Sequence, residues 1–474
     1  MGLKFPDIPL YQGFHHPCRF EGNIFDLEID GEIPDAIKGT FYRCGPDPQF
    51  PPLLGTDVRF NGDGIVTAFR FENGHVDFSS RYVRTDKFKL ERAARRALFG
   101  AYRNPFTDDP SVRGKIRGTA NTHVMFHAGK LLALKEDSPP VAMDPFTLAT
   151  CGYDYFDGKL TSETFTAHPK IDPETGELVA FGYEAKGLAT NDIFVFSADR
   201  AGKVTWSAWV KVPYVGMVHD FGVTQKHILF YICPLATNME LLHKGGPHFA
   251  WDSTLPTYLG VMHRGGDGRD IRWFKGPGYM CTHTMGAWNE GEKIFWDMDG
   301  GDSNQFPFFP QLYEKWDPVK ATGRVMRFTV NLANRHQSTY GIENLYDGVS
   351  GALSRQDDRY HTVPYRYGFL LSSDRATGSR WAMFDHQART ASFYTPGHGT
   401  SLAEMTFVPR RKGSPEGDGY LIGVASRQSE NGRSDLILVD THQLDAGPVA
   451  TVKMPYRIHG QIHGFWVPGD QLPT

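Results

Sequence analysis

The chain has 474 residues, of which 40% are hydrophobic and 13% aromatic, enough apolar material for a large core. Its formal net charge is −4, and the chain has no clustered excess of basic residues of the kind that a nucleic-acid-binding surface needs. We therefore expect no nucleic-acid partner. The five cysteines are far apart and form no Cys-x-x-Cys pair, which argues against a disulfide framework and favours a reducing cytoplasm.

The N-terminal segment, residues 1–11, contains Asp7 and two prolines but no basic stretch followed by an apolar one. This composition does not fit a signal peptide. Further along the chain, no run approaches the ~18 uninterrupted apolar residues that span a bilayer. We therefore expect a cytoplasmic protein without stable membrane insertion.

Short β-branched and aromatic runs, separated by turns rich in glycine and proline, predict an all-β protein. A clear hairpin joins 66–71 to 75–82 through Asn73-Gly74. Such units recur every ~40–60 residues, which favours the blades of a β-propeller, with two stacked sheets as the alternative. The later predicted hairpins lie at 171–183, 193–210, 289–296, 381–394 and 420–439.

Three segments interrupt the strands. Leu90–Ala101 has apolar residues at helical spacing, and 237–248 and the proline-rich 305–318 resemble long connections. We interpret them as a helical and loop cap over the active-site face of the propeller, because long loops often carry function. No low-complexity linker divides the chain, so we predict a single domain over residues 1–474.

Four of the 19 histidines lie at predicted strand edges in compact motifs. In a ring of blades, such distant residues can meet near the axis, and histidine nitrogens suit iron, zinc and copper. Spacing alone does not choose among these metals or exclude other histidines. The four are His168, His219, His283 and His463, with His459 as a rival for the last position and His127, His263 and His386 as further candidates.

Several motifs together resemble the carotenoid cleavage oxygenase family across essentially the whole chain. They are Phe60-Asn61-Gly62-Asp63-Gly64, His168-Pro169-Lys170-Ile171-Asp172-Pro173, His219-Asp220-Phe221 and His463-Gly464-Phe465-Trp466. The resemblance implies a seven-bladed β-propeller in which His168, His219, His283 and His463 hold one Fe(II). It also implies that His459 is not a ligand.

The segments 98–110 and 134–139 are similar to the bacterial phenylpropanoid branch of that family, the lignostilbene dioxygenases and isoeugenol oxygenases. This similarity implies that Phe60 stacks on the substrate, whereas Tyr102 and Lys135 bind its phenolic hydroxyl. Without the resemblance, the same residues would be interpreted as a core phenylalanine, a tyrosine in a capping hydrogen bond and a solvated strand lysine.

The resemblance further implies that glutamates accept the second ring N–H of three ligand histidines and thereby orient them. Glu136 and Glu404 match two of these glutamates. Ala352 occupies the place of the third, because Ala352-Leu353-Ser354-Arg355 stands where the family has Glu-Phe-Pro-Arg. We therefore expect one ligand to be oriented by water or another group, or the iron to be held more loosely.

The implied activity is that of a non-haem iron dioxygenase that uses O₂ to cleave the central C=C of a 4-hydroxystilbene into two aromatic aldehydes. An ammonium beside the phenol favours phenolate, which feeds electron density to the alkene. A homodimer and a role in aromatic compound catabolism accompany this hypothesis. The alternatives, in order, are an isoeugenol-type oxygenase, an apocarotenoid oxygenase and a catalytically silent propeller that only binds ligands.

Overall fold

The computed structural model describes residues 3–473, which consist mainly of strands, turns and loops. Two α-helices occur among these residues, α1 (Asp86–Ala94) and α2 (Met239–His243). Neither approaches the length that a bilayer crossing requires. The other helical segments in this range are single turns of 3₁₀-helix, among them Arg59–Asn61.

The chain groups into two compact units. The first unit comprises Met1–Asp157, Glu240–His248 and Thr395–Thr474, and the second comprises Gly158–Met239 and Phe249–Tyr394. Each sheet described below belongs to one unit only.

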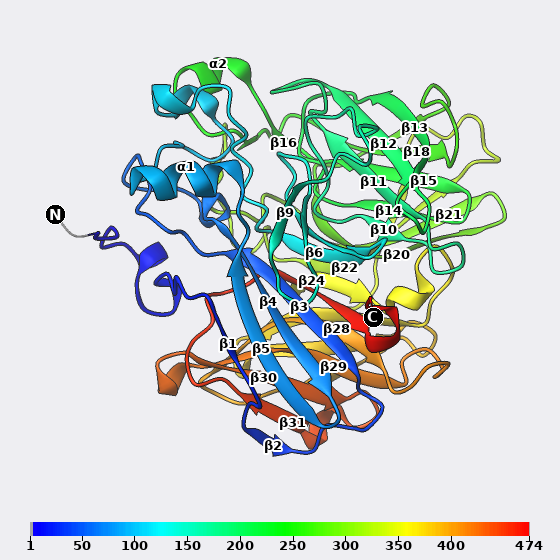
Figure 1. The fold of residues 1–474 in the computed structure, drawn as a ribbon. Coiled ribbons are helices and arrows are strands. Elements are labelled where there is room, and N and C mark those ends of the chain that lie inside the picture. Colours follow the sequence, from blue (N-terminus) through cyan, green and yellow to red (C-terminus); the bar gives the residue numbers. More distant parts are fainter. Residues whose placement is uncertain (1–2, 474) are drawn as a thin grey trace. The chain divides into compact units, whose positions relative to one another are not determined.

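The described part of the first unit contains three antiparallel sheets, and Figure 1 shows β5, β4 and β3 of one of them side by side. In two sheets an early strand pairs with a late one, β3 with β32 and β2 with β31. The sheets, each in spatial order, are β1 (Gly22–Ile24), β5 (His75–Tyr82), β4 (Gly64–Glu72), β3 (Gly39–Pro46) and β32 (His463–Pro468); β2 (Ile29–Gly31), β31 (Pro448–Lys453), β30 (Arg433–Asp440), β29 (Gly419–Arg427) and β28 (Thr400–Pro409); and β6 (His123–His127), β7 (Lys130–Leu134), β8 (Val141–Met143) and β9 (Thr150–Tyr153).

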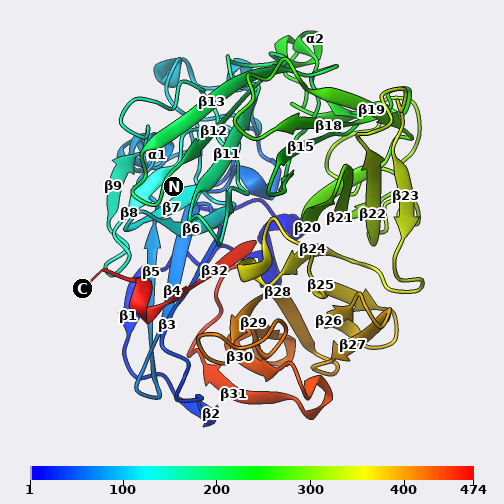
Figure 2. The same ribbon diagram turned by 90° about the vertical axis from the view of Figure 1, so that its right-hand side faces the viewer.

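The second unit contains four four-stranded antiparallel sheets and one two-stranded sheet, β16 (Leu235–Ala236) with β17 (Ala250–Trp251), among the described residues. Figure 2 shows two of the larger sheets, β20 to β23 and β24 to β27, as separate meanders. The four are β10 (Lys170–Ile171), β11 (Leu178–Tyr183), β12 (Asp192–Ala198) and β13 (Val204–Lys211); β14 (Phe221–Val223), β15 (His227–Ile232), β18 (Thr257–His263) and β19 (Arg272–Gly276); β20 (Met280–Glu290), β21 (Lys293–Gly301), β22 (Arg324–Asn331) and β23 (Gly341–Asn344); and β24 (Gly351–Gln356), β25 (Tyr367–Asp374), β26 (Gly378–Asp385) and β27 (Thr390–Tyr394).

The seven large sheets within residues 3–473 confirm the predicted fold class, an all-β seven-bladed propeller. The predicted hairpins are also present, and β4 and β5 are joined by Asn73 (φ 51°) and Gly74 (φ 82°), as a tight primed turn requires. Burial follows position in the sheet, since β12 is buried along its whole length whereas β13 alternates between buried and exposed residues. The cap over the active-site face and the single domain over 1–474 remain predictions.

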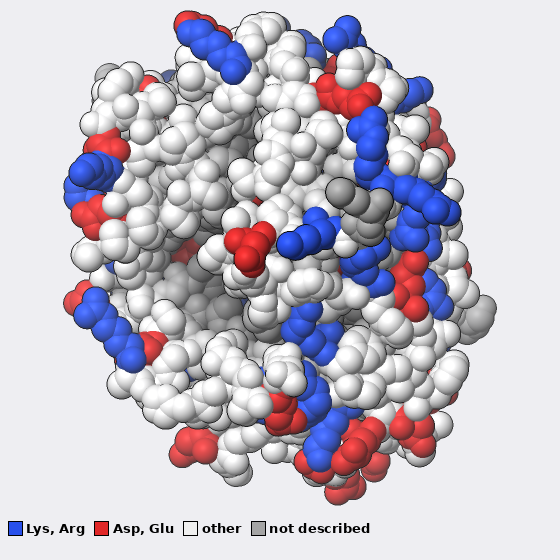
Figure 3. Space-filling view, turned by 90° about the vertical axis from the view of Figure 1, so that its left-hand side faces the viewer, with Lys and Arg blue, Asp and Glu red and all other residues white. Residues whose placement is uncertain are grey.

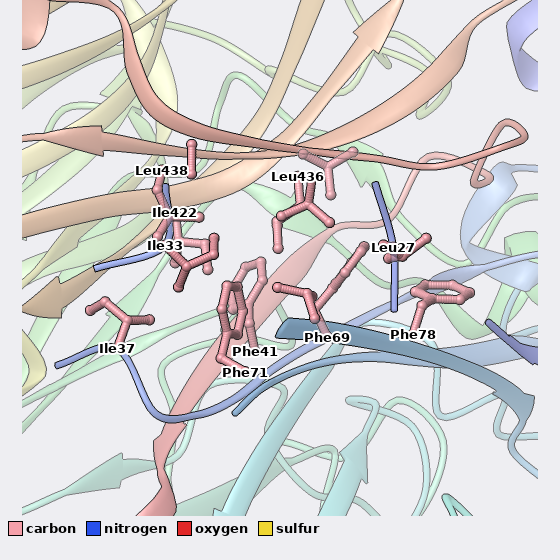
Figure 4. Close-up of a cluster of buried hydrophobic side chains, with 14 of the residues drawn as sticks. Leu27, Ile33, Ile37, Phe41, Phe69, Phe71, Phe78, Ile422, Leu436 and Leu438 are labelled. Carbon is pink, nitrogen blue, oxygen red and sulfur yellow. The ribbon is translucent and has the colours of Figure 1, made fainter. Parts of the chain in front are cut away.

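The core of the first unit is an aromatic and aliphatic cluster between two of its sheets (Figure 4). Phe41, Phe69, Phe71 and Phe78 come from β3, β4 and β5, and they face aliphatic residues of β29 and β30. The rings of Phe69 and Phe78 lie 5.0 Å apart between centroids. Burying one such side chain contributes ~1.5–3 kcal/mol to the free energy of unfolding, so this cluster alone can hold the two sheets together.

The helix predicted over Leu90–Ala101 is wrong in its limits, because α1 begins at Asp86 and ends at Ala94. Arg95 adopts a left-handed conformation (φ 55°) that stops the helix. The Glu91 carboxylate then accepts the backbone N–H groups of Leu98 and Phe99, at 2.9 and 3.1 Å. The apolar residues that follow Ala94 therefore lie outside the helix, although their spacing is that of a helix.

The surface carries both signs of charge. On the face drawn in Figure 3, lysine and arginine side chains are interspersed with aspartate and glutamate side chains. This distribution agrees with the small net charge of the chain.

Candidate metal centre and substrate site

Three of the four predicted ligands lie together in the second unit. His168 and His219 lie just before β10 and β14, and His283 lies within β20. The Nε2 atom of His219 is 3.2 Å from Nε2 of His168 and 3.2 Å from Nε2 of His283. The three rings are nearly perpendicular to one another, with centroids 4.7 to 5.2 Å apart. Three ring nitrogens therefore converge on one point.

This donor set fits a transition-metal ion. A ring nitrogen has either one proton or one lone pair, so Nε2 of His219 cannot make good hydrogen bonds to both neighbouring nitrogens. A cation, in contrast, accepts lone pairs from all three. Two nitrogens that each lie ~2.1 Å from one ion, at ~100° to each other, are ~3.2 Å apart. Imidazole ligands suit Fe, Zn and Cu, so geometry alone does not identify the metal.

A buried carboxylate, Asp220, ties the three ligand segments together. It accepts the N–H of Phe221 at 2.7 Å and the N–H of Thr284 at 2.8 Å, and it pairs with Lys170 Nζ at 2.7 Å. Each of these donors lies within two residues of a different ligand histidine. The aspartate of the His-Asp-Phe motif is thus a hub that fixes the three segments relative to one another, a role that the sequence prediction missed.

The imidazole of His283 faces a second buried carboxylate that the prediction also missed. Nδ1 of His283 lies 3.4 Å from Oδ2 of Asp299, near the end of β21. Burial raises the pKa of Asp299, but contacts with His283, Thr282 and Ser354 outweigh burial and hold that pKa below its usual value. A carboxylate is therefore available beside His283 although Ala352 offers none.

The fourth predicted ligand, His463, lies in the first unit at the start of β32. Its Nδ1 atom donates to Oε1 of Glu404 at 2.8 Å, and Oε2 of Glu404 accepts the N–H of Gly464 at 2.9 Å. Both side chains are buried. Because Nδ1 carries the proton, Nε2 carries the lone pair that a metal ligand needs. The register of β32 with β3 places His463 opposite Cys44.

The rival histidines make other contacts. Nε2 of His459 donates to the carbonyl of His15 at 3.2 Å, and burial, followed by the nearby Arg59, lowers the pKa of His459 to about 3. The ring of His263 lies against that of His227, tilted by 35°, with centroids 4.7 Å apart. Nδ1 of His386 lies 2.9 Å from the hydroxyl of Tyr346. His127 is buried at the end of β6.

The three predicted substrate-binding residues come together within the first unit. Lys135 directly follows β7, and its Nζ atom donates to the carbonyl oxygen of Phe60 at 3.0 Å. The same Nζ lies 4.8 Å from the ring centroid of Tyr102 and 5.7 Å from that of Phe60. A buried ammonium thus lies against two aromatic faces, an arrangement that stabilises the cation.

Burial changes the acidity of both polar groups. It lowers the pKa of Lys135 below the usual lysine value and raises the pKa of Tyr102 well above the usual tyrosine value, with Glu136 adding to the latter. Tyr102 therefore stays protonated and can donate a hydrogen bond. The Lys135 ammonium is held by a carbonyl and by aromatic rings, and a negative oxygen would be a favourable further partner.

Side-chain amides of two asparagines fix the loops that carry these residues. Asn121 Nδ2 donates to the carbonyls of Phe60 and Gly62, at 2.8 and 2.6 Å. Asn61 Nδ2 donates to the carbonyl of Gly100 at 2.8 Å, next to Tyr102. The motif around Phe60 is therefore joined to the segment 98–110 by a hydrogen bond.

Glu136, the other glutamate predicted to orient a ligand, is buried directly after Lys135. One of its oxygens lies 3.7 Å from Nη1 of Arg103. Arg103 has a left-handed backbone conformation (φ 52°), and its carbonyl accepts a hydrogen bond from Nδ1 of His248 at 3.0 Å. The pairing of Glu136 with a ligand histidine remains a prediction.

Comparison with known proteins matches residues 15–468 to the family described as retinal pigment epithelial membrane protein. Lignostilbene-α,β-dioxygenase isozyme III of Sphingomonas paucimobilis is 45% identical over 99% of both chains. Isoeugenol monooxygenase of Pseudomonas nitroreducens is 41% identical over 95% of this chain and 96% of its own. The crystal structure of Pseudomonas brassicacearum lignostilbene dioxygenase matches with a TM-score of 0.95 at 40% identity, and the match covers 99% of this chain and 100% of that one.

Proposed function

The chain belongs to the retinal pigment epithelial membrane protein family, the carotenoid cleavage oxygenases, and from this membership we propose that it cleaves the central C=C of a 4-hydroxystilbene with O₂. The products are two aromatic aldehydes. The observation that carries this proposal is the buried Lys135 ammonium, which lies against the rings of Tyr102 and Phe60. That cluster is suited to a phenolic ring and not to a purely apolar chain.

Iron(II) is the cofactor we propose, one per chain, held by His168, His219, His283 and His463, each of which offers one ring nitrogen. Neutral imidazoles leave the ion its full positive charge, and His463 is oriented for this role by Glu404. When bound, iron(II) supplies the activation of O₂ for reaction with the alkene. No side chain of the protein needs to act as a nucleophile.

Lys135 prepares the substrate for this reaction. Its ammonium has three N–H donors, and the carbonyl of Phe60 takes one of them, so two remain for a phenolic oxygen. A buried ammonium stabilises phenolate over phenol. Phenolate in turn raises the electron density of the conjugated alkene, which is the bond that reacts.

Tyr102 and Phe60 position the ring. The Tyr102 hydroxyl stays protonated because burial raises its pKa, so it can donate a second hydrogen bond to the phenolic oxygen. Phe60 holds Lys135 through its carbonyl and presents its ring for stacking on an aromatic substrate. Orientation by these three contacts fixes which double bond reacts.

An isoeugenol-type oxygenase is the second candidate, because Lys135 and Tyr102 recognise one phenolic ring and would also hold a propenyl phenol. The Phe60 ring favours the longer, two-ring stilbene. An apocarotenoid fits less well, since an apolar substrate leaves the buried ammonium without a polar ligand group. A propeller that only binds ligands would need no converging imidazoles. We place the protein in the cytoplasm, in aromatic compound catabolism, with a homodimer as one assembly compatible with the proposal.

The deciding experiment is a comparison of substrates. Iron is measured after anaerobic purification, and aldehyde release is then followed from a 4-hydroxystilbene, isoeugenol and an apocarotenal. We expect about one iron per chain and the fastest release from the stilbene. Faster release from isoeugenol would establish the second candidate, and iron-free protein that releases no aldehyde would establish a binding role.

A further inference from the structure

We propose that Asp299 is the positioning residue that orients the imidazole of His283, in place of the glutamate for which Ala352 is substituted. The inference rests on the proposed iron site. An Nδ1–H of His283 that points to the Asp299 carboxylate leaves the lone pair on Nε2, the atom that faces His219 at 3.2 Å.

The contact arises from the pairing of β20 with β21. The register of the two strands shifts between Cys281 and Thr284, so His283 lies in an irregular part of β20. There, Asp299 accepts the backbone N–H of His283 through Oδ1 at 3.2 Å, and its Oδ2 faces Nδ1 of the same residue at 3.4 Å. One carboxylate therefore accepts the backbone N–H of His283 and lies beside its ring.

Donors from neighbouring segments fix Asp299 itself, which is fully buried. The hydroxyl of Thr282 donates to Oδ1, and the N–H of Ser354 donates to Oδ2 at 2.8 Å. The Ser354 hydroxyl also donates to the carbonyl of His283 at 2.9 Å. Because Asp299 has a short side chain and several fixed donors, its carboxylate has little freedom to turn away from the ring.

Two differences in β24 act together. Ala352 has no acceptor to offer, and Ser354 provides a backbone N–H where the corresponding family segment has a proline, which has none. Ala352, which removes the usual carboxylate, thus lies two positions before Ser354, whose N–H holds Asp299. With the Ala352 change alone, a proline at 354 would leave Oδ2 of Asp299 without the N–H that fixes it.

Asp299 also joins β20 to β24, so an experiment must separate ring orientation from structural support. The rate of iron release to a chelator reports how well the ligands hold the metal. The increase in melting temperature on iron binding reports the same property relative to the iron-free protein. A purely structural role lowers the melting temperature with and without iron by similar amounts.

The test compares Asp299→Asn with Asp302→Asn, an exposed aspartate three residues away that pairs with Arg324. We expect ~10–100-fold faster iron release from Asp299→Asn, the usual effect of losing a residue that orients a metal ligand. Asp302→Asn should match the wild type. In Asp299→Ala, the added change Ala352→Glu should restore slow release, because a glutamate again faces His283.

Equal release rates for the two asparagine variants would overturn the inference and leave the proposed function intact. The inference would also be overturned if Asp299→Asn lowered the melting temperature of the iron-free protein as much as that of the iron-loaded protein. A wild-type protein that binds no iron would overturn the proposed function and the inference together. Release that stays fast in Asp299→Ala/Ala352→Glu would show that the loss is not one of ring orientation.

Discussion

The three histidine segments of the second unit and the Lys135 cluster of the first unit are held in different ways. In the second unit, His168, His219 and His283 lie at or near strand ends, and charged carboxylates fix the segments around them. In the first unit, the Lys135 ammonium is held by a neutral group, the Phe60 carbonyl, which also accepts the side-chain amide of Asn121. Charge-assisted contacts suit atoms that must converge on one ion, whereas neutral contacts leave the Lys135 charge available for a ligand.

The largest expected effect is the loss of a metal ligand. Replacing His168, His219, His283 or His463 with Ala should remove most of the iron and all aldehyde release, because three ligands leave an exchangeable site. His459→Ala should keep its iron, since Nε2 of His459 already donates to the His15 carbonyl. Iron content and stilbene turnover are the measurements. If His459→Ala loses iron as completely as His463→Ala, the ligand assignment is wrong.

The carboxylate hub of the second unit should come next. Asp220→Ala leaves Lys170 and two backbone N–H groups without their acceptor, so the free energy of unfolding should fall by ~3 kcal/mol. Iron retention should fall as well. Denaturant unfolding of the iron-free protein measures the first effect. Lys170→Met is the matched variant, because it removes only one of the three contacts, and an equal loss in both variants would contradict the hub.

The next prediction concerns the contact between Lys135 of the first unit and the phenolic oxygen of the substrate. Lys135→Met keeps the length of the stem but removes the charge, and the 4-O-methyl ether of the substrate removes the ionisable group. Each loses ~1–3 kcal/mol of interaction, which corresponds to ~5–150-fold in turnover. The two changes together should be little worse than either alone, because they break the same contact. Equal rates of aldehyde release from both substrates in the wild type would rule out the phenolate mechanism.

The smallest effect is expected from Ala352→Glu alone. With Asp299 already facing His283, an added glutamate has no ring N–H to take, so the rate of iron release should change by less than ~2-fold. The measurement is release to a chelator from the otherwise unchanged protein. A much slower release would show that water, and not Asp299, orients His283.

Local patterns predicted the strands well because each hairpin is encoded by its own turn. Asn73 and Gly74 adopt the positive φ values that their residue types favour, so β4 and β5 could be placed from sequence. The end of α1 could not be predicted in this way. It depends on the Glu91 carboxylate, which accepts N–H groups seven and eight residues later in the chain.

In the candidate site, too, contacts that depend on distant parts of the chain could not be predicted from local sequence patterns. The convergence of His168, His219 and His283 followed from family motifs, as did the meeting of Tyr102 with Lys135. Asp220 and Asp299 were missed because their roles depend on strand register and on an irregular pairing that no local pattern encodes. A carboxylate inside a buried strand, as in Asp297-Met298-Asp299-Gly300-Gly301, is the signal that could have pointed to Asp299.

The pairing of β3 with β32 has a consequence for the order of events during synthesis. Arg43 donates to the carbonyl of Ile462, which is 419 residues away in the sequence, and His463 follows directly. A ribosome adds ~5–20 residues per second, so β3 waits tens of seconds for its partner strand. During that interval β3 is an open sheet edge, and chaperones that cover such edges would protect the nascent chain. If His463 is an iron ligand as proposed, it can bind iron only after this late closure.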